Sequence, residues 1–511
     1  EKGAIFWELD VKRQVKNQIR WSGENEITVQ EAQMRTFSNF AWMFMRTEGD
    51  YNFSTGSRGR GNLSSVANPY FLFPQIYNFR YNIYSSEWPV ANRAIELYLQ
   101  KKSENEGWER QINGLSNNEK ANLLLEKHTF KELLADVEQR NLQNNIVGLE
   151  ASRIFARSEI NMGVDAFRDS LYAMLKRNTF LNIKFENMLD TLGQMSRTDI
   201  YSSLKEWEQL TPLPFYSIGE PELTKVVNKG GEEFFVLKVL VSNNSDYDGI
   251  IQMNVLQNGW WYQPLEDPRA RKKVEIAAHT TKEFVSVWEE QIREVEVNTM
   301  ISGNLPYMIR QSIGNVKQER NKIVKDSIYT LPESSLEMPG EIIVDNEDST
   351  LFVLSTPPVV GLLPKWLDEV EETPFKYSGI SWWRAPLQWT ATTNAKYYGK
   401  YIRSAYVIKS GDGSQTATWK IPVPEAGQYE LYYYVFKNDE LRWNDRLQGE
   451  YHFRVAYDSE VEDAYINLRK ANEGWEQLGT YYFSADTVRV VLTDECKLRS
   501  VTADAVKIVK R

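Results

Sequence analysis

The spacing of apolar residues changes along the chain and separates a helical part from a strand-rich part. Between about residues 89 and 210, apolar residues recur every three or four positions, as in Val164, Phe167, Leu171 and Leu175. This spacing places them on one side of a helix. The pattern predicts short amphipathic helices that bury their apolar sides against one another.

Capping residues support the helical interpretation. Ser116 with Glu119, and Thr129 with Glu132, have the capping-box spacing in which a hydroxyl and a carboxylate satisfy the first backbone N–H groups of a helix. We therefore expect a mainly α-helical domain over residues 1–212.

From about residue 213, runs rich in β-branched and aromatic residues replace the helical spacing. Residues 234–241, 250–256 and 282–288 are such runs, and turn-forming residues separate them. Short strands over about a hundred residues are typical of an immunoglobulin-like sandwich. We predict this sandwich over residues 213–330, followed by a proline-containing linker at 331–340.

Residues 341–511 have the same strand-like character. The run 415–421 alternates apolar and polar residues, 428–436 is the most strand-like run of the chain, and 488–492 is rich in valine. The fold class expected is multidomain α+β, with an N-terminal α-helical domain followed by two antiparallel β-sandwich domains. The chain is long enough for each of these domains to bury its own core.

Charge and cysteine content exclude several classes of protein. The net charge of −10 lacks the basic footprint of a nucleic-acid-binding protein. Cys496 is the single cysteine, so the chain cannot form an internal disulfide. No run of about 20 apolar residues is present, so no transmembrane segment is predicted. Because the chain begins with Glu1, we expect a mature exported chain or a part of a longer protein.

The familiar catalytic signatures are absent from the sequence. The three histidines, His128, His279 and His452, are far apart, and there is no His-Glu-x-x-His, Cys-x-x-Cys, Gly-x-Ser-x-Gly or phosphate-binding loop. The sequence thus favours a non-enzymatic protein without excluding an enzyme.

Aromatic residues supply the candidate binding site. They make up 13% of the chain, and six of them fall between residues 382 and 401. Flat rings stack on sugars at low entropic cost, and they also fill protein cores. The candidate ligand-binding residues are Trp382, Trp383, Trp389, Tyr397 and Tyr398, on the hypothesis that one or two of these rings are exposed.

A short acidic run is the one candidate for a metal. Residues 344–348 read Val-Asp-Asn-Glu-Asp, and carboxylates such as Asp345 and Asp348 are ligands for Ca²⁺. The order of residues does not match a calcium loop, so a capped turn is the preferred interpretation. We predict no cofactor.

The last 170 residues resemble the golvesin C-terminal-like domain, also described as the carbohydrate-binding-like domain of a xanthan lyase. The matching phrases occur in family order at residues 344–348, 398–405, 417–419, 426–432, 474–479 and 503–506. The resemblance implies a jelly-roll-like sandwich over 341–511, found in exported bacterial proteins. It also implies attachment to a glycan or to the cell surface.

A second resemblance covers about residues 155–215. Residues 161–182, followed by Leu192, Trp207 and Pro214, are similar to the helical end of the catalytic region in gluzincin metallo-aminopeptidases. The zinc ligands and the general-base glutamate of that family have no counterpart here. The likeness implies a non-catalytic relative or a part of such a protein.

Three functional hypotheses follow. The leading one is an exported bacterial envelope protein (periplasmic, cell-surface or secreted) that binds polysaccharide or cell-envelope glycan, and other envelope proteins, without catalysis. The first alternative is a polysaccharide lyase of the xanthan type that uses the residues Arg58, Arg60, Tyr70, Tyr77, Asn78, Arg80 and Tyr81. The second alternative is the exported portion of a larger, membrane-associated aminopeptidase-like assembly.

Overall fold

The chain forms two compact units in the computed structural model. Unit 1 comprises residues 1–104 and 150–205, and unit 2 comprises residues 105–149 and 206–511. The residues that the structure describes are 12, 15–17, 19–20, 28–35, 81–99, 106–178, 181–210, 212–227, 230–256, 267–314, 316–320, 324–336, 340–355, 375–380, 385–437 and 449–511.

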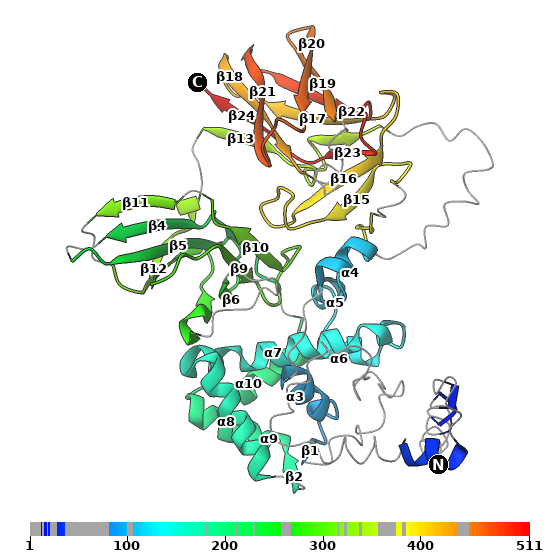
Figure 1. Ribbon diagram of the computed structural model, residues 1–511, viewed down its shortest axis with the longest axis vertical. Coiled ribbons are helices and arrows are strands. Elements are labelled where there is room, and N and C mark those ends of the chain that lie inside the picture. Colours follow the sequence, from blue (N-terminus) through cyan, green and yellow to red (C-terminus); the bar gives the residue numbers. More distant parts are fainter. Residues whose placement is uncertain are drawn as a thin grey trace. The chain divides into compact units, whose positions relative to one another are not determined.

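The first part of the described chain is helical (Figure 1), as the apolar spacing predicts. A short parallel pair, β1 (Tyr81–Tyr84) with β2 (Leu181–Lys184), accompanies the helices. The helices are α3 (Ala91–Leu99), α4 (Glu106–Asn113), α5 (Asn117–Leu125), α6 (Phe130–Ala135), η2 (Glu138–Asn141), α7 (Gln143–Met162), α8 (Val164–Arg177), α9 (Phe185–Ser196), α10 (Ile200–Lys205) and η3 (Glu206–Glu208).

Both predicted capping boxes are confirmed. The Ser116 hydroxyl accepts a hydrogen bond from the Glu119 backbone N–H at 3.2 Å, and the Glu119 carboxylate accepts one from the Ser116 N–H at 2.7 Å. Thr129 and Glu132 repeat the arrangement at the start of α6. Because these bonds satisfy donors that the helix itself leaves unpaired, they fix where each helix begins.

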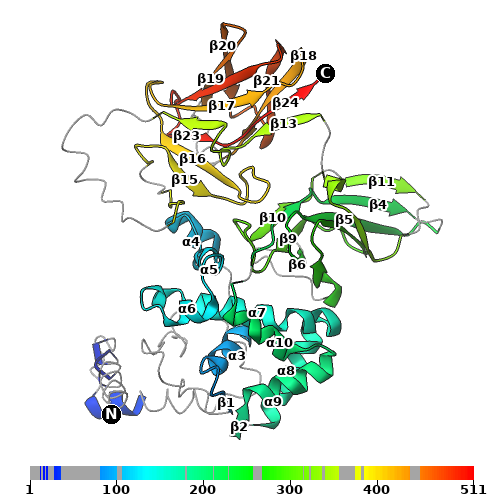
Figure 2. The same cartoon turned by 180° about the vertical axis from the view of Figure 1, so that it is seen from behind.

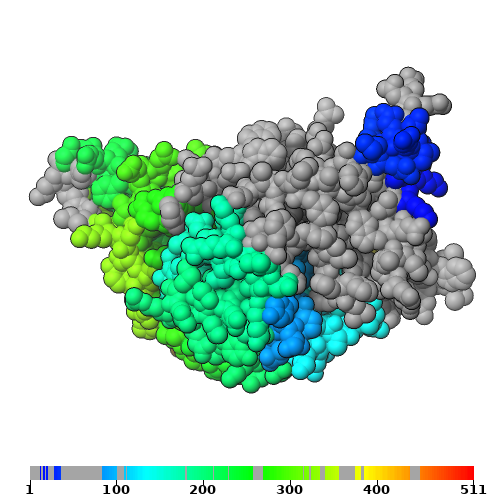
Figure 3. Space-filling view, turned by 90° about the horizontal axis from the view of Figure 1, so that it is seen from below, coloured from blue at the N-terminus to red at the C-terminus, as the bar shows by residue number. Residues whose placement is uncertain are grey.

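The apolar side of α8 is buried within unit 1. Phe167, Leu171 and Leu175 have no exposed surface. The Tyr98 ring of α3 packs on Phe155 with ring centroids 4.8 Å apart and on Phe167 at 6.2 Å. Segments near residues 90 and 200, blue and green in Figure 3, accordingly share one surface.

The middle of the chain is a two-sheet sandwich, as predicted. One sheet has the order β11-β4-β5-β8-β12, with β3 paired to β5, and the other has the order β10-β9-β6-β7. All neighbouring strands are antiparallel except β11 with β4. The strands are β3 (Tyr216–Ile218), β4 (Glu222–Val227), β5 (Glu233–Asn243), β6 (Gly249–Leu256), β7 (Arg271–Ile276), β8 (Thr280–Trp288), β9 (Glu294–Asn298), β10 (Met308–Ser312), β11 (Val316–Arg320) and β12 (Ser327–Pro332), with η4 (Pro268–Ala270) before β7.

The turn between β5 and β6 carries the chain from one sheet to the other. Leu237, Val239 and Val241 of β5 therefore face Ile251 and Val255 of β6 across the core. The alternation of buried and half-buried residues over 237–241 of β5 reflects this packing.

The predicted linker at 331–340 is only partly free of the sandwich. Its first two residues end β12, and η5 (Glu333–Leu336) follows directly. Asn244 donates a hydrogen bond to the Glu333 carboxylate at 2.7 Å, and His279 Nδ1 lies 2.9 Å from it. These contacts hold the beginning of the linker on the middle sandwich.

A small apolar cluster within unit 2 joins helix, middle sandwich and C-terminal sandwich. It contains Leu115, Leu305, Tyr377 and Ala391, all at most 6% exposed. Backbone bonding reinforces it, because the Arg403 N–H donates to the Leu305 carbonyl at 2.6 Å.

The C-terminal part of the chain is a β-sandwich (Figure 2), as predicted, and its buried residues form one core. Its sheets have the orders β13-β24-β18-β21 and β14-β17-β22-β19-β20, and a third sheet, β15-β16-β23, completes it. The strands are β13 (Glu341–Val344), β14 (Phe352–Leu354), β15 (Thr390–Thr393), β16 (Ser404–Lys409), β17 (Thr416–Pro422), β18 (Gly427–Val435), β19 (Glu450–Tyr457), β20 (Glu460–Asn467), β21 (Gly474–Phe483), β22 (Thr487–Thr493), β23 (Ser500–Ala503) and β24 (Val506–Lys510).

Asp504 interrupts what the sequence presents as one strand near the C-terminus. Residues 504–505 separate β23 from β24, which belong to different sheets. The Asp504 side chain is fully buried and its Oδ2 accepts a hydrogen bond from the Tyr398 N–H at 3.2 Å. Its carbonyl accepts one from the Trp419 indole N–H at 3.2 Å. Asp504 is thus an internal hydrogen-bonding anchor.

The acidic run after β13 forms a capped turn. The Asp345 N–H donates to Asp348 Oδ2 at 3.0 Å, and Asp345 Oδ1 accepts from the Asn346 N–H at 2.7 Å. Burial raises the pKa of Asp345 to about 8, and the charges of Glu347 and Asp348 act in the same direction. Within the described ranges, no three His, Cys, Asp or Glu side chains are placed to hold a metal ion.

Candidate functional site

The five sequence-predicted binding residues have different surroundings. Trp382 and Trp383 lie outside the described residues. Trp389 is half-buried and packs against the core of the C-terminal sandwich. Tyr397 is 5% exposed and its ring packs edge-on against Phe436, with centroids 4.6 Å apart. Only Tyr398 among the described candidates belongs to a group of aromatic rings that reaches the surface.

That group lies on the outer face of the sheet β13-β24-β18-β21. Side chains alternate across β18, so Leu431, Tyr433 and Val435 enter the core while Tyr432 and Tyr434 point outward. Outward-facing residues of neighbouring strands lie beside them in register.

Two cross-strand rows place the remaining residues. In the first row, Lys507 of β24 pairs with Tyr432 on one side and with Ile343 of β13 on the other. In the second row, Trp475 of β21 pairs with Tyr434. We call Tyr398, Tyr432, Tyr434, Trp475 and Lys507 the sheet-face cluster.

Three rings of the sheet-face cluster contact one another. The Tyr398 centroid lies 5.0 Å from that of Trp475 and 5.5 Å from that of Tyr434. Tyr434 and Trp475 meet edge to face at 5.2 Å. Edge-to-face and tilted pairs are the favoured geometries for aromatic rings, so the rings hold each other in place.

Lys507 binds this aromatic surface through its ammonium group. Its Nζ lies 4.8 Å from the Trp475 ring centroid and 5.3 Å from that of Tyr432. The same Nζ donates to Glu341 Oε1 at 2.9 Å. The ammonium is therefore held by two rings and one carboxylate, and its side chain is only 12% exposed.

A second carboxylate, that of Glu430, binds the hydroxyl group of Tyr432. Glu430 accepts hydrogen bonds from the Tyr432 hydroxyl at 2.6 Å and from Arg511 Nε at 3.0 Å. The bond from Tyr432 lowers the pKa of Glu430, and Arg511 adds to the effect. Burial raises the pKa of Tyr434 to about 12, so its hydroxyl stays protonated at neutral pH.

The chemistry of the sheet-face cluster is that of a binding surface. Half-buried rings offer apolar faces to the C–H groups of a ligand, and the carboxylates of Glu341 and Glu430 accept hydrogen bonds from hydroxyl groups.

Sequence reasoning missed Tyr432, Tyr434 and Trp475 as site residues. The alternation within residues 428–436 marks Tyr432 and Tyr434 as one face of a strand, and this signal was available. Trp475 and Tyr398 lie far away in sequence, so only the pairing of β18 with β21 and the folding of the 397–400 turn bring them together.

Of the proposed lyase residues, all but Tyr81 lie outside the described part, and Tyr81 begins β1.

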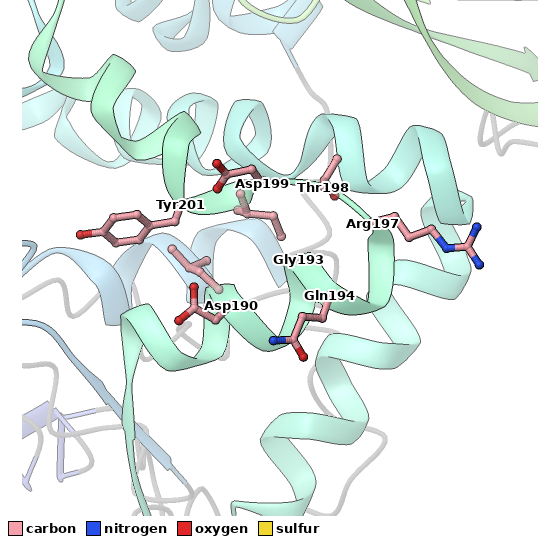
Figure 4. A pocket seen from close by; sticks show the side chains of 9 residues that line it. Asp190, Gly193, Gln194, Arg197, Thr198, Asp199 and Tyr201 are labelled. Atoms are coloured by element: carbon pink, nitrogen blue, oxygen red, sulfur yellow. The ribbon is translucent and has the colours of Figure 1, made fainter.

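A separate depression lies in unit 1, between α9 and α10 (Figure 4), with a volume of about 420 Å³. Asp190 and Asp199 line it, while the Arg197 side chain extends away from both carboxylates. Asp199 Oδ1 accepts a hydrogen bond from the Ser202 N–H at 3.0 Å. This bond caps the start of α10, so Asp199 has a structural role there.

Among the helices that the structure describes, none combines the length and the apolarity that crossing a membrane requires.

Comparison with known families defines the C-terminal sandwich. Residues 383–510 match the family described as the Golvesin C-terminal domain. This confirms the resemblance seen in the sequence and covers β15 to β24, including all of the sheet-face cluster. β13 lies before the match, yet it pairs with β24 and completes the same sheet.

Similar solved structures come from several kinds of protein. They include a GH26-CBM35 β-(1,4)-mannanase from Podospora anserina (12% identity, TM-score 0.18, 34% of this chain and 28% of that chain). A CBM35 from Cellvibrio japonicus Abf62 has 10% identity and a TM-score of 0.18, over 25% of this chain and 83% of that chain. Aminopeptidase A of Legionella pneumophila has 16% identity and a TM-score of 0.18, over 33% of this chain and 18% of that chain.

The overlap covers most of the CBM35 chain but only a small part of the mannanase and of the aminopeptidase. This chain spans less than a third of the mannanase, and at such TM-scores the likeness carries no argument about function. No curated protein matches the chain.

Proposed function

We propose that the protein is an exported, non-catalytic binding protein whose C-terminal sandwich attaches to a polysaccharide or cell-envelope glycan through the sheet-face cluster. The observation that carries the proposal is the contact of Tyr398, Tyr434 and Trp475 on the solvent side of a sheet, beside Tyr432 and Lys507. An outer sheet face needs no aromatic core of its own, which supports a role for these rings in contacts outside the chain.

The match to the Golvesin C-terminal domain supports this assignment. The family resemblance implies a role in exported bacterial proteins and in glycan or surface attachment. Other envelope proteins remain proposed partners, and a periplasmic, cell-surface or secreted location is part of the same proposal. Two of the similar structures contain a CBM35 domain, but likenesses with such low TM-scores add no support to the proposal.

The surface chemistry also suits a sugar ligand. Each sugar ring has an apolar C–H face and a rim of hydroxyl groups. An aromatic ring packs against the face, and carboxylates such as Glu341 and Glu430 accept hydrogen bonds from the rim. Because the sheet holds the rings in place before binding, little conformational entropy is lost on association.

Affinity electrophoresis of the full chain through gels that contain soluble plant and bacterial polysaccharides tests the proposal. We expect at least one polysaccharide to retard the protein, and Trp475→Ala to weaken that binding at least about tenfold. Tyr482→Ala is the matched control, because Tyr482 lies on the same strand, is 60% exposed and points outward at the far end of the face. Equal loss in both variants, or no retardation by any polysaccharide, would refute the proposal.

A further inference from the structure

The cation at the centre of the sheet-face cluster already has a partner of opposite charge. Lys507 Nζ lies 2.9 Å from Glu341 Oε1, and the two side chains are 12% and 22% exposed. Because solvent screens such a half-buried pair only partly, the charge of Lys507 is balanced at contact distance. The aromatic rings of Trp475 and Tyr432 hold the same ammonium from the other side.

The neighbouring cations are paired in the same way. Arg511 donates to Glu430 at 3.0 Å, and Lys396 Nζ contacts both carboxylate oxygens of Glu473 at 3.0 and 3.2 Å. Neither pair leaves an excess of positive charge at the face.

Charges of both signs also lie near Tyr434. Burial is the largest cause of the raised pKa of Tyr434, the carboxylates of Asp504, Glu220 and Glu473 act in the same direction, and the charge of Arg403 opposes them. An anion placed against Tyr434 and Trp475 would therefore meet carboxylates as well as cations.

This balance separates two classes of glycan. A uronate carboxylate would have to displace Glu341 from Lys507 or accept the repulsion of Glu341 and Glu430. A neutral sugar needs no such exchange, since its hydroxyls donate to carboxylate oxygens and its C–H face covers the rings. Electrostatics then sets specificity more than affinity.

We propose that Glu341 makes the sheet-face cluster selective for neutral glycans over polyuronates by neutralising Lys507, an inference that rests on the proposed function. Glu341 is the specificity-determining residue, and Lys507 supports the rings.

The variant Glu341→Gln tests this role with little change of shape. The amide keeps an acceptor for Lys507 but removes the negative charge, so Lys507 becomes available to an anion. We expect Glu341→Gln to bind polygalacturonate at least about threefold more tightly than the parent at low salt. The gain should disappear at about 0.5 M salt, where charges are screened within a few ångströms.

Glu425→Gln is the matched control. Glu425 forms an ion pair with Lys510 on the same sandwich, is 71% exposed and has no contact with the sheet-face rings. The control therefore makes the same charge change and also frees a lysine, but away from the cluster. Its binding of polygalacturonate should equal that of the parent.

Affinity electrophoresis with polygalacturonate and with neutral xylan, mannan and β-glucan gels separates the outcomes, and circular dichroism confirms folding of each variant. Retardation by a neutral polymer, weak retardation by polygalacturonate and a gain in Glu341→Gln alone support the inference. If the parent binds polygalacturonate as tightly as any neutral polymer, or if Glu425→Gln gains equally, the inference is wrong and the proposed glycan binding stands. If no gel retards the parent, both are overturned.

Discussion

The pKa of Asp345 leads to a specific prediction about stability and pH. Asp345 follows β13, and burial raises the pKa of its carboxyl to about 8 in the folded protein, compared with 3.8 for an ordinary aspartate. At pH values between these two pKa values, a carboxyl group whose pKa is raised by folding binds more protons in the folded state than in the unfolded state. The free energy of unfolding therefore falls as pH rises from about 4 to about 8.

The magnitude follows from the difference between the two pKa values. At about 1.4 kcal/mol for each pKa unit, the ceiling is about 5 to 6 kcal/mol between pH 4 and pH 8. By its accessible surface Asp345 is half-buried, and the hydrogen bond from the Asn346 N–H, followed by the charge of Lys376, offsets part of the rise in its pKa. We therefore expect an effect of about 2 kcal/mol, because solvent screens a half-buried charge.

The substitution Asp345→Asn removes this titration. The amide oxygen still accepts the Asn346 N–H, which Asp345 Oδ1 accepts at 2.7 Å. We expect the variant to be about 2 kcal/mol more stable than the parent at pH 8.5 and nearly equal to it at about pH 3.5, below the pKa of the unfolded carboxyl.

Hydrogen exchange of peptides from β13 and β24, corrected for the intrinsic exchange rate at each pH, measures the opening free energy of this sandwich without requiring whole-chain unfolding to be two-state. Glu460→Gln, which removes one carboxylate at the exposed start of β20, is the control for net charge. If Asp345→Asn keeps the parent's dependence on pH, Asp345 is not the titrating group and the argument from burial fails.

Two further predictions address the core and the linker. Trp419→Ala removes a fully buried ring that packs on Phe352 and Tyr433 and donates to the Asp504 carbonyl. Chemical denaturation should therefore show the C-terminal sandwich destabilised by about 3–5 kcal/mol. A loss below about 1 kcal/mol would contradict the packing described. Hydrogen bonds first to Asp246 and then to Glu333 raise the pKa of His279, so the stabilisation is present below about pH 6.5 and is lost as pH rises through the folded pKa. His279→Gln should therefore reduce the hydrogen-exchange protection of η5 at pH 5.5 more than at pH 8.5, and an equal reduction at both would contradict the pairing.

Much of the fold was predictable because its signals are local. The capping boxes at Ser116 and Thr129 and the apolar spacing of α8 depend on residues within a few positions of one another. The alternating run in β17 likewise predicts its own strand.

The candidate site was only partly predictable for the opposite reason. A high local density of aromatics drew attention to residues 382–401, but density does not tell a core ring from a surface ring. Tyr397 and Tyr398 are neighbours in sequence, yet one is buried against Phe436 while the other meets Trp475. The turn at 397–400 decides between these surroundings.

The sequence by itself determined where helices and strands form, that two sandwiches follow a helical part, and that the last one resembles the Golvesin C-terminal domain. These features follow from periodicity, caps and short phrases, which act over a few residues. The tertiary structure alone decided that Lys507 lies between Glu341 and the ring of Trp475. That arrangement depends on the register of β13, β24, β18 and β21, and strand register is set by packing between segments that are distant in the chain.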